Sequence, residues 1–122
     1  MEELLHTENW KNESVSLKQL QLNLRELESR SSYPAHWRFF LDFITNNKFE
    51  SVIDIGCGVG AYARLIKDNF IDIKYTGIDY SQVAIEIAKK QWDFGHFECK
   101  DYKELTAEYL QKFDLVLLGA RS

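Results

Sequence analysis

The sequence has few cysteines and no long apolar run, which excludes several classes of protein. Its two cysteines, Cys57 and Cys99, form no CxxC pair, so neither a disulfide framework nor a zinc ribbon is indicated. No apolar run approaches the roughly 18 residues that a membrane span needs. The acidic and polar start MEELLHTENW does not resemble a signal peptide. We therefore expect a cytoplasmic protein with no membrane partner.

Clustered histidines and an excess of positive charge are also absent. None of the three histidines has a metal-ligand spacing to a second histidine or a cysteine, so we expect no metal site. The net charge of −4 does not indicate the basic surface that nucleic-acid binding requires. With 45% hydrophobic and 28% charged residues, the composition is that of an ordinary globular domain.

The first part of the chain has the spacing of helices. Four leucines recur at intervals of three and four residues, namely Leu17, Leu20, Leu24 and Leu27. This stripe predicts a helix that packs on the following domain, with a partner-binding or lid helix as the alternative. The single proline, Pro34, suits the first turn of a second helix over 35–44. Residues 1–50 are thus predicted to form a helical extension of a domain at 51–122.

From residue 51 onward, strand and helix patterns alternate. Predicted strands cover 51–55, 74–79, 96–99 and 114–118. Predicted helices cover 61–70, 81–92 and 104–113. Apolar strands that alternate with helices through short loops predict an α/β fold, in which helices cover both faces of a parallel sheet.

Glycine is scarce, and three of the six glycines lie in SVIDIGCGVG, residues 51–60. Gly56, Gly58 and Gly60 follow the first predicted strand, where ligands bind in such sheets, and glycine permits positive φ and close approach of a ligand. A nucleotide-triphosphate loop would need Gly-Lys-Ser/Thr, which GVGAYAR lacks. Gly56, Gly58 and Ala61 satisfy the dinucleotide pattern G-x-G-x-x-G/A, so the glycines alone leave NAD or FAD open.

Asp54 precedes the first glycine by two residues and favours a different ligand. Two like charges about 5 Å apart repel by a few kcal/mol at an effective dielectric constant of about 20, so a pyrophosphate would be repelled at this rim. S-adenosylmethionine carries an ammonium and a sulfonium group, and an acid here would attract it.

Four segments together resemble the class I S-adenosylmethionine-dependent methyltransferases. VIDIGCGVG resembles their D/E-x-G-x-G-x-G cofactor loop, and YTGIDYS resembles their second strand with its acidic loop. CKDY and FDLVLLGA resemble the third-strand acid and the fourth strand. The resemblance covers about residues 51–120. It implies a Rossmann-like three-layer sandwich with strand order 3-2-1-4, and methyl transfer from S-adenosylmethionine that leaves S-adenosylhomocysteine.

The resemblance also implies roles for residues after the second and third strands. Asp79 would accept hydrogen bonds from both ribose hydroxyls, or it would only help to cap the next helix. Tyr80 would lie against adenine, or it would be a half-buried surface tyrosine. Asp101 would accept from the adenine amino group, with helix capping as the alternative, and the Tyr102 amide would meet a ring nitrogen.

The loop is expected to line the methionine portion of the cofactor. Cys57 would contribute its main chain there, as a small loop residue rather than a reactive thiol. Gly119 follows the fourth strand, where family members open the cofactor and acceptor site. The expected cofactor-binding residues are Asp54, Gly56, Cys57, Gly58, Gly60, Asp79, Tyr80, Asp101, Tyr102 and Gly119.

The resemblance implies a seven-stranded sheet for a whole class I domain, and only four strands are predicted here. We therefore expect a cofactor-binding half of a methyltransferase, as a truncated product, as part of a split enzyme or as a module with a non-catalytic role. No catalytic residue can be nominated. The fourth strand would be an exposed edge, so we expect self-association or pairing with a partner there.

The acceptor is expected to be a small molecule, because the sequence shows no basic surface of the kind that binds nucleic acid. A non-catalytic S-adenosylmethionine-binding or interaction module is the alternative function. An NAD-binding oxidoreductase domain is less favoured, because Asp54 opposes it and no residues for hydride transfer can be identified.

Overall fold

Four parallel strands form the centre of the molecule. The structure, a computed structural model, describes residues 2–70 and 72–118, with side chains described from residue 12. The strands β1 (Ser51–Ile55), β2 (Lys74–Asp79), β3 (His96–Cys99) and β4 (Leu115–Leu118) pair in the order β3-β2-β1-β4. The predicted α/β fold with a 3-2-1-4 parallel sheet is confirmed.

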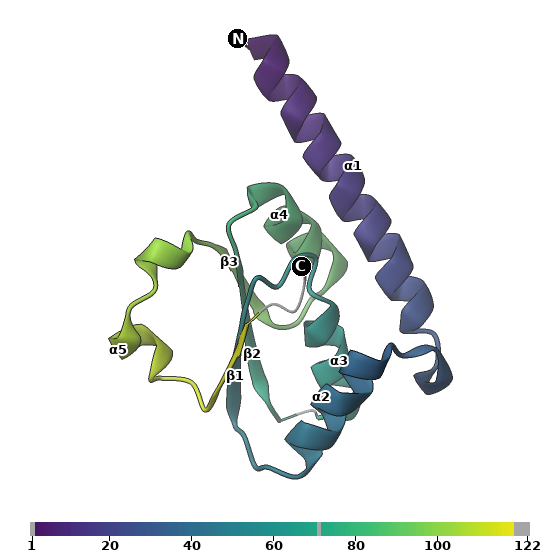
Figure 1. Ribbon diagram of the computed structural model, residues 1–122, viewed down its shortest axis with the longest axis vertical. Coiled ribbons are helices and arrows are strands. Elements are labelled where there is room, and N and C mark those ends of the chain that lie inside the picture. Colours follow the sequence, from purple (N-terminus) through teal and green to yellow (C-terminus); the bar gives the residue numbers. More distant parts are fainter. Residues whose placement is uncertain (1, 71, 119–122) are drawn as a thin grey trace.

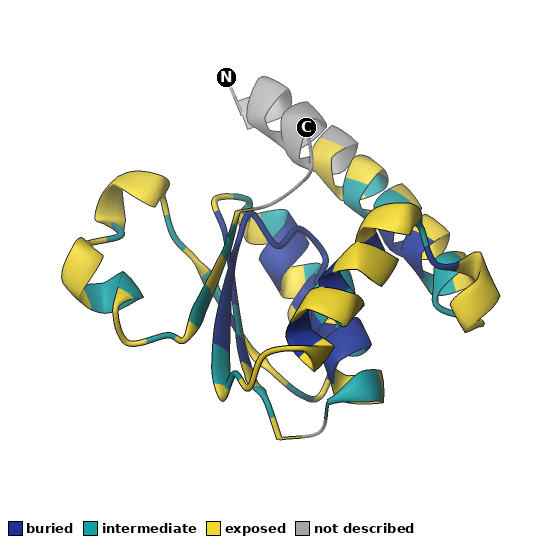
Figure 2. Ribbon diagram, turned by 60° about the horizontal axis from the view of Figure 1, so that its bottom comes forward, coloured by how far each residue is buried: buried dark blue, intermediate teal, exposed yellow. Residues whose placement is uncertain are grey.

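Most of the helices cover one face of this sheet (Figure 1). They are α2 (Ala35–Thr45), α3 (Ala61–Asn69) and α4 (Gln82–Gln91). The buried residues gather between these helices and the sheet (Figure 2). Each helix places an apolar stripe on the strands, for example Phe40 and Ile44 of α2 against Val52 of β1, and burial of this surface drives the packing.

The long N-terminal helix α1 (Glu2–Glu26) lies outside this layer and contacts α4. A short 3₁₀ helix, η1 (Arg30–Ser32), links it to α2. Leu20 is buried in the main core, and Leu24 and Leu27 pack against it. Leu17 is exposed, so the leucine stripe anchors only the second half of α1. The first half extends past the end of the sheet (Figure 1).

The opposite face of the sheet is covered more lightly. Ile53, Ile55 and Ile78 form a buried cluster there, against which residues of the segment 105–113 pack. The single helix predicted at 104–113 is wrong, because the structure has two short helices, η2 (Tyr102–Glu104) and α5 (Ala107–Leu110). The side chain of Thr106 accepts a hydrogen bond from the amide of Tyr109, which starts a new helix where the pattern suggested a continuous one.

Within the described ranges, no helix is long and apolar enough to cross a membrane. The same residues contain no cluster of three or more histidine, cysteine or acidic side chains that could bind a metal ion.

Candidate functional site

The glycine loop turns sharply from β1 into α3 and is tied to β2. The amides of Gly56 and Cys57 both donate to the carbonyl of Ile78, at 2.7 and 3.0 Å. Gly56, Gly58 and Gly60 all have positive φ, at 82°, 57° and 88°. Residues with a Cβ adopt this left-handed region at a cost, which explains the three glycines in physical terms.

Gly60 has a second reason to be glycine. A Cβ at this position would lie 2.9 Å from Cε1 of Phe97 and 3.1 Å from Cδ1 of Trp92. The indole Nε1 of Trp92 also donates to the carbonyl of Val59 at 2.9 Å. Buried aromatic rings from β3 and the end of α4 therefore hold the loop from beneath, and Gly60 serves this packing rather than lining the cavity described below.

Asp79, the last residue of β2, joins the glycine loop to the start of α4. Its Oδ2 accepts from the amide of Gly58 at 2.9 Å, and its Oδ1 accepts from the amide of Ser81 at 2.9 Å. Ser81 in turn caps α4, because its Oγ accepts from the amide of Ala84. The contact to Ser81 is the capping alternative from the sequence. A carboxylate can accept about four hydrogen bonds, so these contacts are compatible with the predicted ribose contact.

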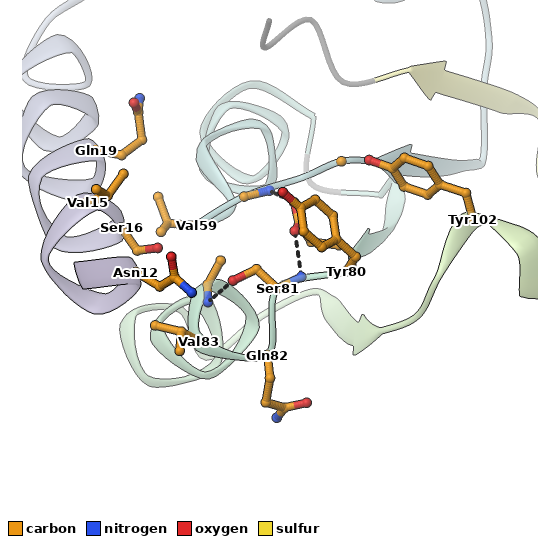
Figure 3. Close-up of a pocket in the computed structure, with 14 residues that line it drawn as sticks. Asn12, Val15, Ser16, Gln19, Val59, Tyr80, Ser81, Gln82, Val83 and Tyr102 are labelled. Atoms are coloured by element: carbon orange, nitrogen blue, oxygen red, sulfur yellow. Dashed lines mark hydrogen bonds between the residues drawn. The ribbon is translucent and has the colours of Figure 1, made fainter. Parts of the chain in front are cut away.

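A pocket of about 540 Å³ opens where β1 and β2 end (Figure 3). This volume lies within the usual range for small-molecule sites, about 300–1,000 Å³. Five of the predicted residues line it: Gly56, Gly58, Asp79, Tyr80 and Tyr102. The structure thus brings together residues from the glycine loop, the end of β2 and the segment after β3, which are far apart in the sequence.

Two tyrosines stand at one side of this pocket. Tyr80 is 73% exposed, and its ring meets the ring of Tyr102 edge to face, with centroids 6.4 Å apart. Asp101 fixes the start of η2, because its side chain accepts from the amide of Lys103 while Glu104 accepts from the Asp101 amide. This capping box sets the backbone that carries Tyr102. Asp101 itself does not line the pocket.

Asp54 does not lie at the rim of the pocket, and this expectation is wrong. Its side chain is only 1% exposed and accepts a 2.6 Å hydrogen bond from the hydroxyl of Tyr75. Alternation along β1 places it on the same side as Val52 of the helix-covered core, whereas Ile53 and Ile55 face the opposite cluster. Burial, with the charge of Asp54 as a second cause, raises the pKa of Tyr62 to about 12. Asp54 therefore belongs to the buried interior, in contact with Tyr75 of β2.

Cys57 and Gly119 are the two remaining residues that the sequence predicted to bind the cofactor. The Cys57 side chain is buried, and its sulfur would lie 2.9 Å from a Cβ at Gly77, so it packs against β2 beneath the loop. This position agrees with a small loop residue rather than a reactive thiol. Gly119 lies outside the described residues.

One wall of the pocket is provided by α1, for which the sequence offered a lid helix as an alternative without naming the residues that line the site. Four residues of this helix line the cavity, namely Asn12, Val15, Ser16 and Gln19. The start of α4 adds Gln82 and Val83. A signal was present in the sequence, because Asn12, Ser16 and Gln19 are spaced by four and three residues and so share one helix face.

The charge of the lining restricts the ligand. Among the described residues that line the pocket, Asp79 is the one carboxylate, and none is lysine, arginine or histidine. The other polar side chains of this lining are neutral hydroxyls and amides. Such a lining suits a neutral or positively charged ligand better than a pyrophosphate, since a carboxylate repels a second anion.

The fold and this pocket define a Rossmann-like α/β domain with a site for a nucleoside-type ligand. Residues 53–120 match the family described as "Methyltransferase domain", which is more than half of the chain. The chain belongs to this family, the class I S-adenosylmethionine-dependent methyltransferases.

Similar proteins act on different acceptors. Malonyl-[acyl-carrier protein] O-methyltransferase of Acetivibrio thermocellus is 34% identical over 82 residues, which are 66% of this chain and 28% of that protein. An uncharacterized RNA methyltransferase of Leptospira interrogans is 33% identical over 85 residues, 67% of this chain and 17% of that protein. The plantazolicin methyltransferase BpumL, solved in complex with SAH, superposes with a TM-score of 0.59 at 25% identity, over 88% of this chain and 40% of that one.

The chain therefore spans less than a third of the length of either curated relative. The family match, residues 53–120, contains the glycine loop, most of the sheet and the pocket residues that follow β1, β2 and β3.

Proposed function

We propose that this chain is the S-adenosylmethionine-binding part of a methyltransferase that acts on a small-molecule acceptor. The observation that carries the proposal is the pocket, which joins Gly56 and Gly58 of the glycine loop, the carboxylate of Asp79 and the rings of Tyr80 and Tyr102. The similarity to BpumL, whose solved structure contains SAH, supports it.

The residues of the pocket fit the parts of this cofactor. The rings of Tyr80 and Tyr102 offer flat apolar surfaces for adenine, and Asp79 offers acceptor oxygens for the ribose hydroxyls. Gly56 and Gly58 line the pocket without side chains, so the methionine portion would meet the backbone of the loop. Asp101 and the Tyr102 amide would add hydrogen bonds to adenine. The cofactor itself supplies an electrophilic methyl group.

This chain contributes chiefly binding and orientation. Methyl transfer is an in-line displacement, so its rate depends on how closely the acceptor atom is held against the methyl group. Gly60 permits the close packing of the loop on Phe97 and Trp92, and the buried side chain of Cys57 packs against β2. None of the described lining residues carries a positive charge that would repel the cationic sulfonium, and the negative charge of Asp79 attracts it.

A small-molecule acceptor is favoured by charge. The net charge of −4 and the absence of basic side chains from the described lining would repel a polyanion such as RNA. A cytoplasmic location is proposed with it, supported by two cysteines without a CxxC pair.

The proposal is tested by titration calorimetry of S-adenosylhomocysteine into the folded chain. Asp79→Ala should abolish binding, but it also removes acceptors for the Gly58 and Ser81 amides. Tyr80→Ala is the cleaner variant, because Tyr80 is largely exposed, and Phe39→Ala is its matched control at 76% exposure outside the pocket. Loss of a stacked base costs about 1–3 kcal/mol, so we expect Tyr80→Ala to weaken binding about 5- to 150-fold.

Three other outcomes would change the conclusion. A folded wild type that does not bind S-adenosylhomocysteine contradicts the cofactor assignment. Binding of NADH in its place would favour an oxidoreductase. Cofactor binding without methyl transfer to any candidate acceptor would favour the non-catalytic module.

A second copy of this chain is the proposed partner, paired along β4. Among the described strands β4 is at the edge of the sheet, and its Val116 and Leu118 side chains are exposed. The opposite edge, β3, carries the charged side chain of Glu98, which forms an ion pair with Lys100 directly after the strand. Charged side chains discourage strand pairing, whereas an apolar edge invites it.

A further inference from the structure

A second cavity, of about 390 Å³, lies at the end of the sheet opposite the pocket of Figure 3. The second half of α3 contributes Ile66 and Lys67 to it, the start of β2 contributes Lys74 and Tyr75, and the turn before β3 contributes Phe94. The lining of this second cavity has no residue in common with that of the pocket. The two are therefore separate sites.

The floor of the second cavity is apolar and rich in aromatic rings. Ile66 and Tyr75 are buried in the main core, and Phe70 and Phe94 are half-buried and pack against the same core. Three rings thus line a cavity that opens to solvent. Aromatic rings pack well against one another in edge-to-face or offset arrangements, so this floor suits a ligand with an aromatic ring.

The charge of the lining is opposite to that of the whole chain. Lys67 and Lys74 line the second cavity together with no aspartate or glutamate, although the net charge of the chain is −4. Both lysines are exposed, and neither forms an ion pair within the part of the chain that the structure describes. The third basic residue, His96, has its Nε2 atom 2.6 Å from Oε1 of Glu98. The two lysines are thus the cations that a ligand can meet.

The ammonium group of Lys67 lies beside the aromatic floor. Its Nζ atom is 5.6 Å from the centroid of the Phe94 ring, which is within the range of a cation–π contact. Lys74 lines the same cavity, and its flexible four-carbon stem lets its ammonium group follow a bound anion. Three acidic residues neighbour these segments in the sequence and do not line the cavity, namely Asp68, Asp72 and Asp93.

We propose that the second cavity binds an aromatic carboxylate, with its ring on the aromatic floor and its carboxylate at Lys67 and Lys74. The volume of about 390 Å³ lies at the small end of the range for small-molecule sites, about 300–1,000 Å³. A methyl acceptor has to touch the methyl group of the cofactor, and the second cavity is at the other end of the sheet. Its ligand is therefore an additional one, and the proposal does not depend on the proposed function.

Titration calorimetry of the folded chain with 2-naphthoate and with 2-naphthamide, its neutral isostere, tests the proposal. We expect wild type to bind 2-naphthoate more tightly than 2-naphthamide, and added salt to weaken only the binding of the carboxylate. Lys67→Met/Lys74→Met removes both ammonium groups and keeps apolar stems. Since exposed charge contacts are modest, this variant should bind 2-naphthoate about 2- to 30-fold more weakly, with its affinity for 2-naphthamide unchanged.

A matched control separates this effect from the change in net charge. Lys18→Met/Lys112→Met also removes two exposed lysines, both outside the lining of the second cavity. This variant should bind both ligands as wild type does. Circular dichroism checks that each variant is folded, and if the cavity variant is not, the comparison of the two ligands and their salt dependence in wild type decides.

Changes in amide chemical shifts in two-dimensional NMR spectra locate the ligand. We expect 2-naphthoate to shift the amides of residues 73–76 and 94–96, and S-adenosylhomocysteine to shift those of residues 56–58 and 79–82. No binding of 2-naphthoate to folded wild type, or shifts confined to the pocket of Figure 3, overturns the proposal. Equal affinity of wild type for 2-naphthoate and 2-naphthamide also overturns it. None of these results bears on S-adenosylhomocysteine binding, so the proposed function is tested separately.

Discussion

Replacing Gly60 by alanine tests whether packing, as well as backbone conformation, makes the last glycine of the loop necessary. With φ at 88°, an alanine would pay about 1–2 kcal/mol for the left-handed conformation. Its Cβ would also lie 2.9 Å from Cε1 and 3.0 Å from Cζ of Phe97. Phe97 is buried, and overpacking of this kind costs about 1–3 kcal/mol. We expect a total destabilisation of about 2–5 kcal/mol.

Gly95→Ala is the matched control. Gly95 has nearly the same φ, at 81°, but the nearest atom to its Cβ would be Cδ1 of Tyr75 at 3.2 Å, with Phe97 at 3.5 Å. The conformational cost is then similar and the steric cost is small. Alanine also restricts the unfolded chain by about 0.4–1 kcal/mol, and this term cancels between the variants. Gly95→Ala should cost about 1–2 kcal/mol.

Urea unfolding followed by circular dichroism measures both variants. Since m is about 1–3 kcal/mol/M for small proteins, the midpoint of Gly60→Ala should fall by roughly 1 M or more. Equal midpoints for the two variants would refute the packing argument, because only Gly60 faces atoms closer than 3.0 Å.

Three further predictions concern the interior and the sheet edge. Tyr75→Phe removes the short hydrogen bond to buried Asp54 and should lower the unfolding free energy by about 1–3 kcal/mol; an unchanged urea midpoint would contradict this. The pKa of Tyr62 is raised from 10.0 to about 12, so its contribution to stability is complete below pH 10 and is lost as the pH rises toward 12. The urea midpoint should therefore drop more between about pH 9 and 11 in wild type than in Tyr62→Phe, and equal drops would count against the argument. Leu118→Lys, at an edge position that is 76% exposed, should reduce self-association in sedimentation experiments, and a monomeric wild type at high concentration would refute pairing through β4.

The order and bounds of the strands could be read from the sequence with few errors. Predicted and observed bounds agree at 51–55, 74–79 and 96–99. SVIDI is an apolar run rich in β-branched residues and has a strong local pattern, whereas KYTGID and HFEC were placed by the alternation of strands with helices. The 3-2-1-4 order followed from the family resemblance. The segment 104–113 was mispredicted because the Thr106 cap lies inside an otherwise helical pattern.

Part of the site could also be predicted from the sequence, because its residues follow predicted strands. Gly56, Gly58, Asp79, Tyr80 and Tyr102 were found because residues at the carboxyl ends of parallel strands meet at one edge of the sheet. Asp54 was misplaced at the rim, since both faces of the central strand β1 are covered and alternation alone does not say which side chain lies under the loop.

Local sequence thus determined the elements, the sharp turn at the glycines and the end of the sheet where a ligand binds. Only the tertiary structure decided that Asp54 is buried against Tyr75, that Phe97 and Trp92 occupy the space beside Gly60, and that α1 closes one side of the pocket. Periodicity shows which residues share a face of a helix. Which of two faces meets the pocket depends on contacts with residues distant in the chain, and here the packing of Leu20 in the core turns Ser16 and Gln19 toward the ligand site.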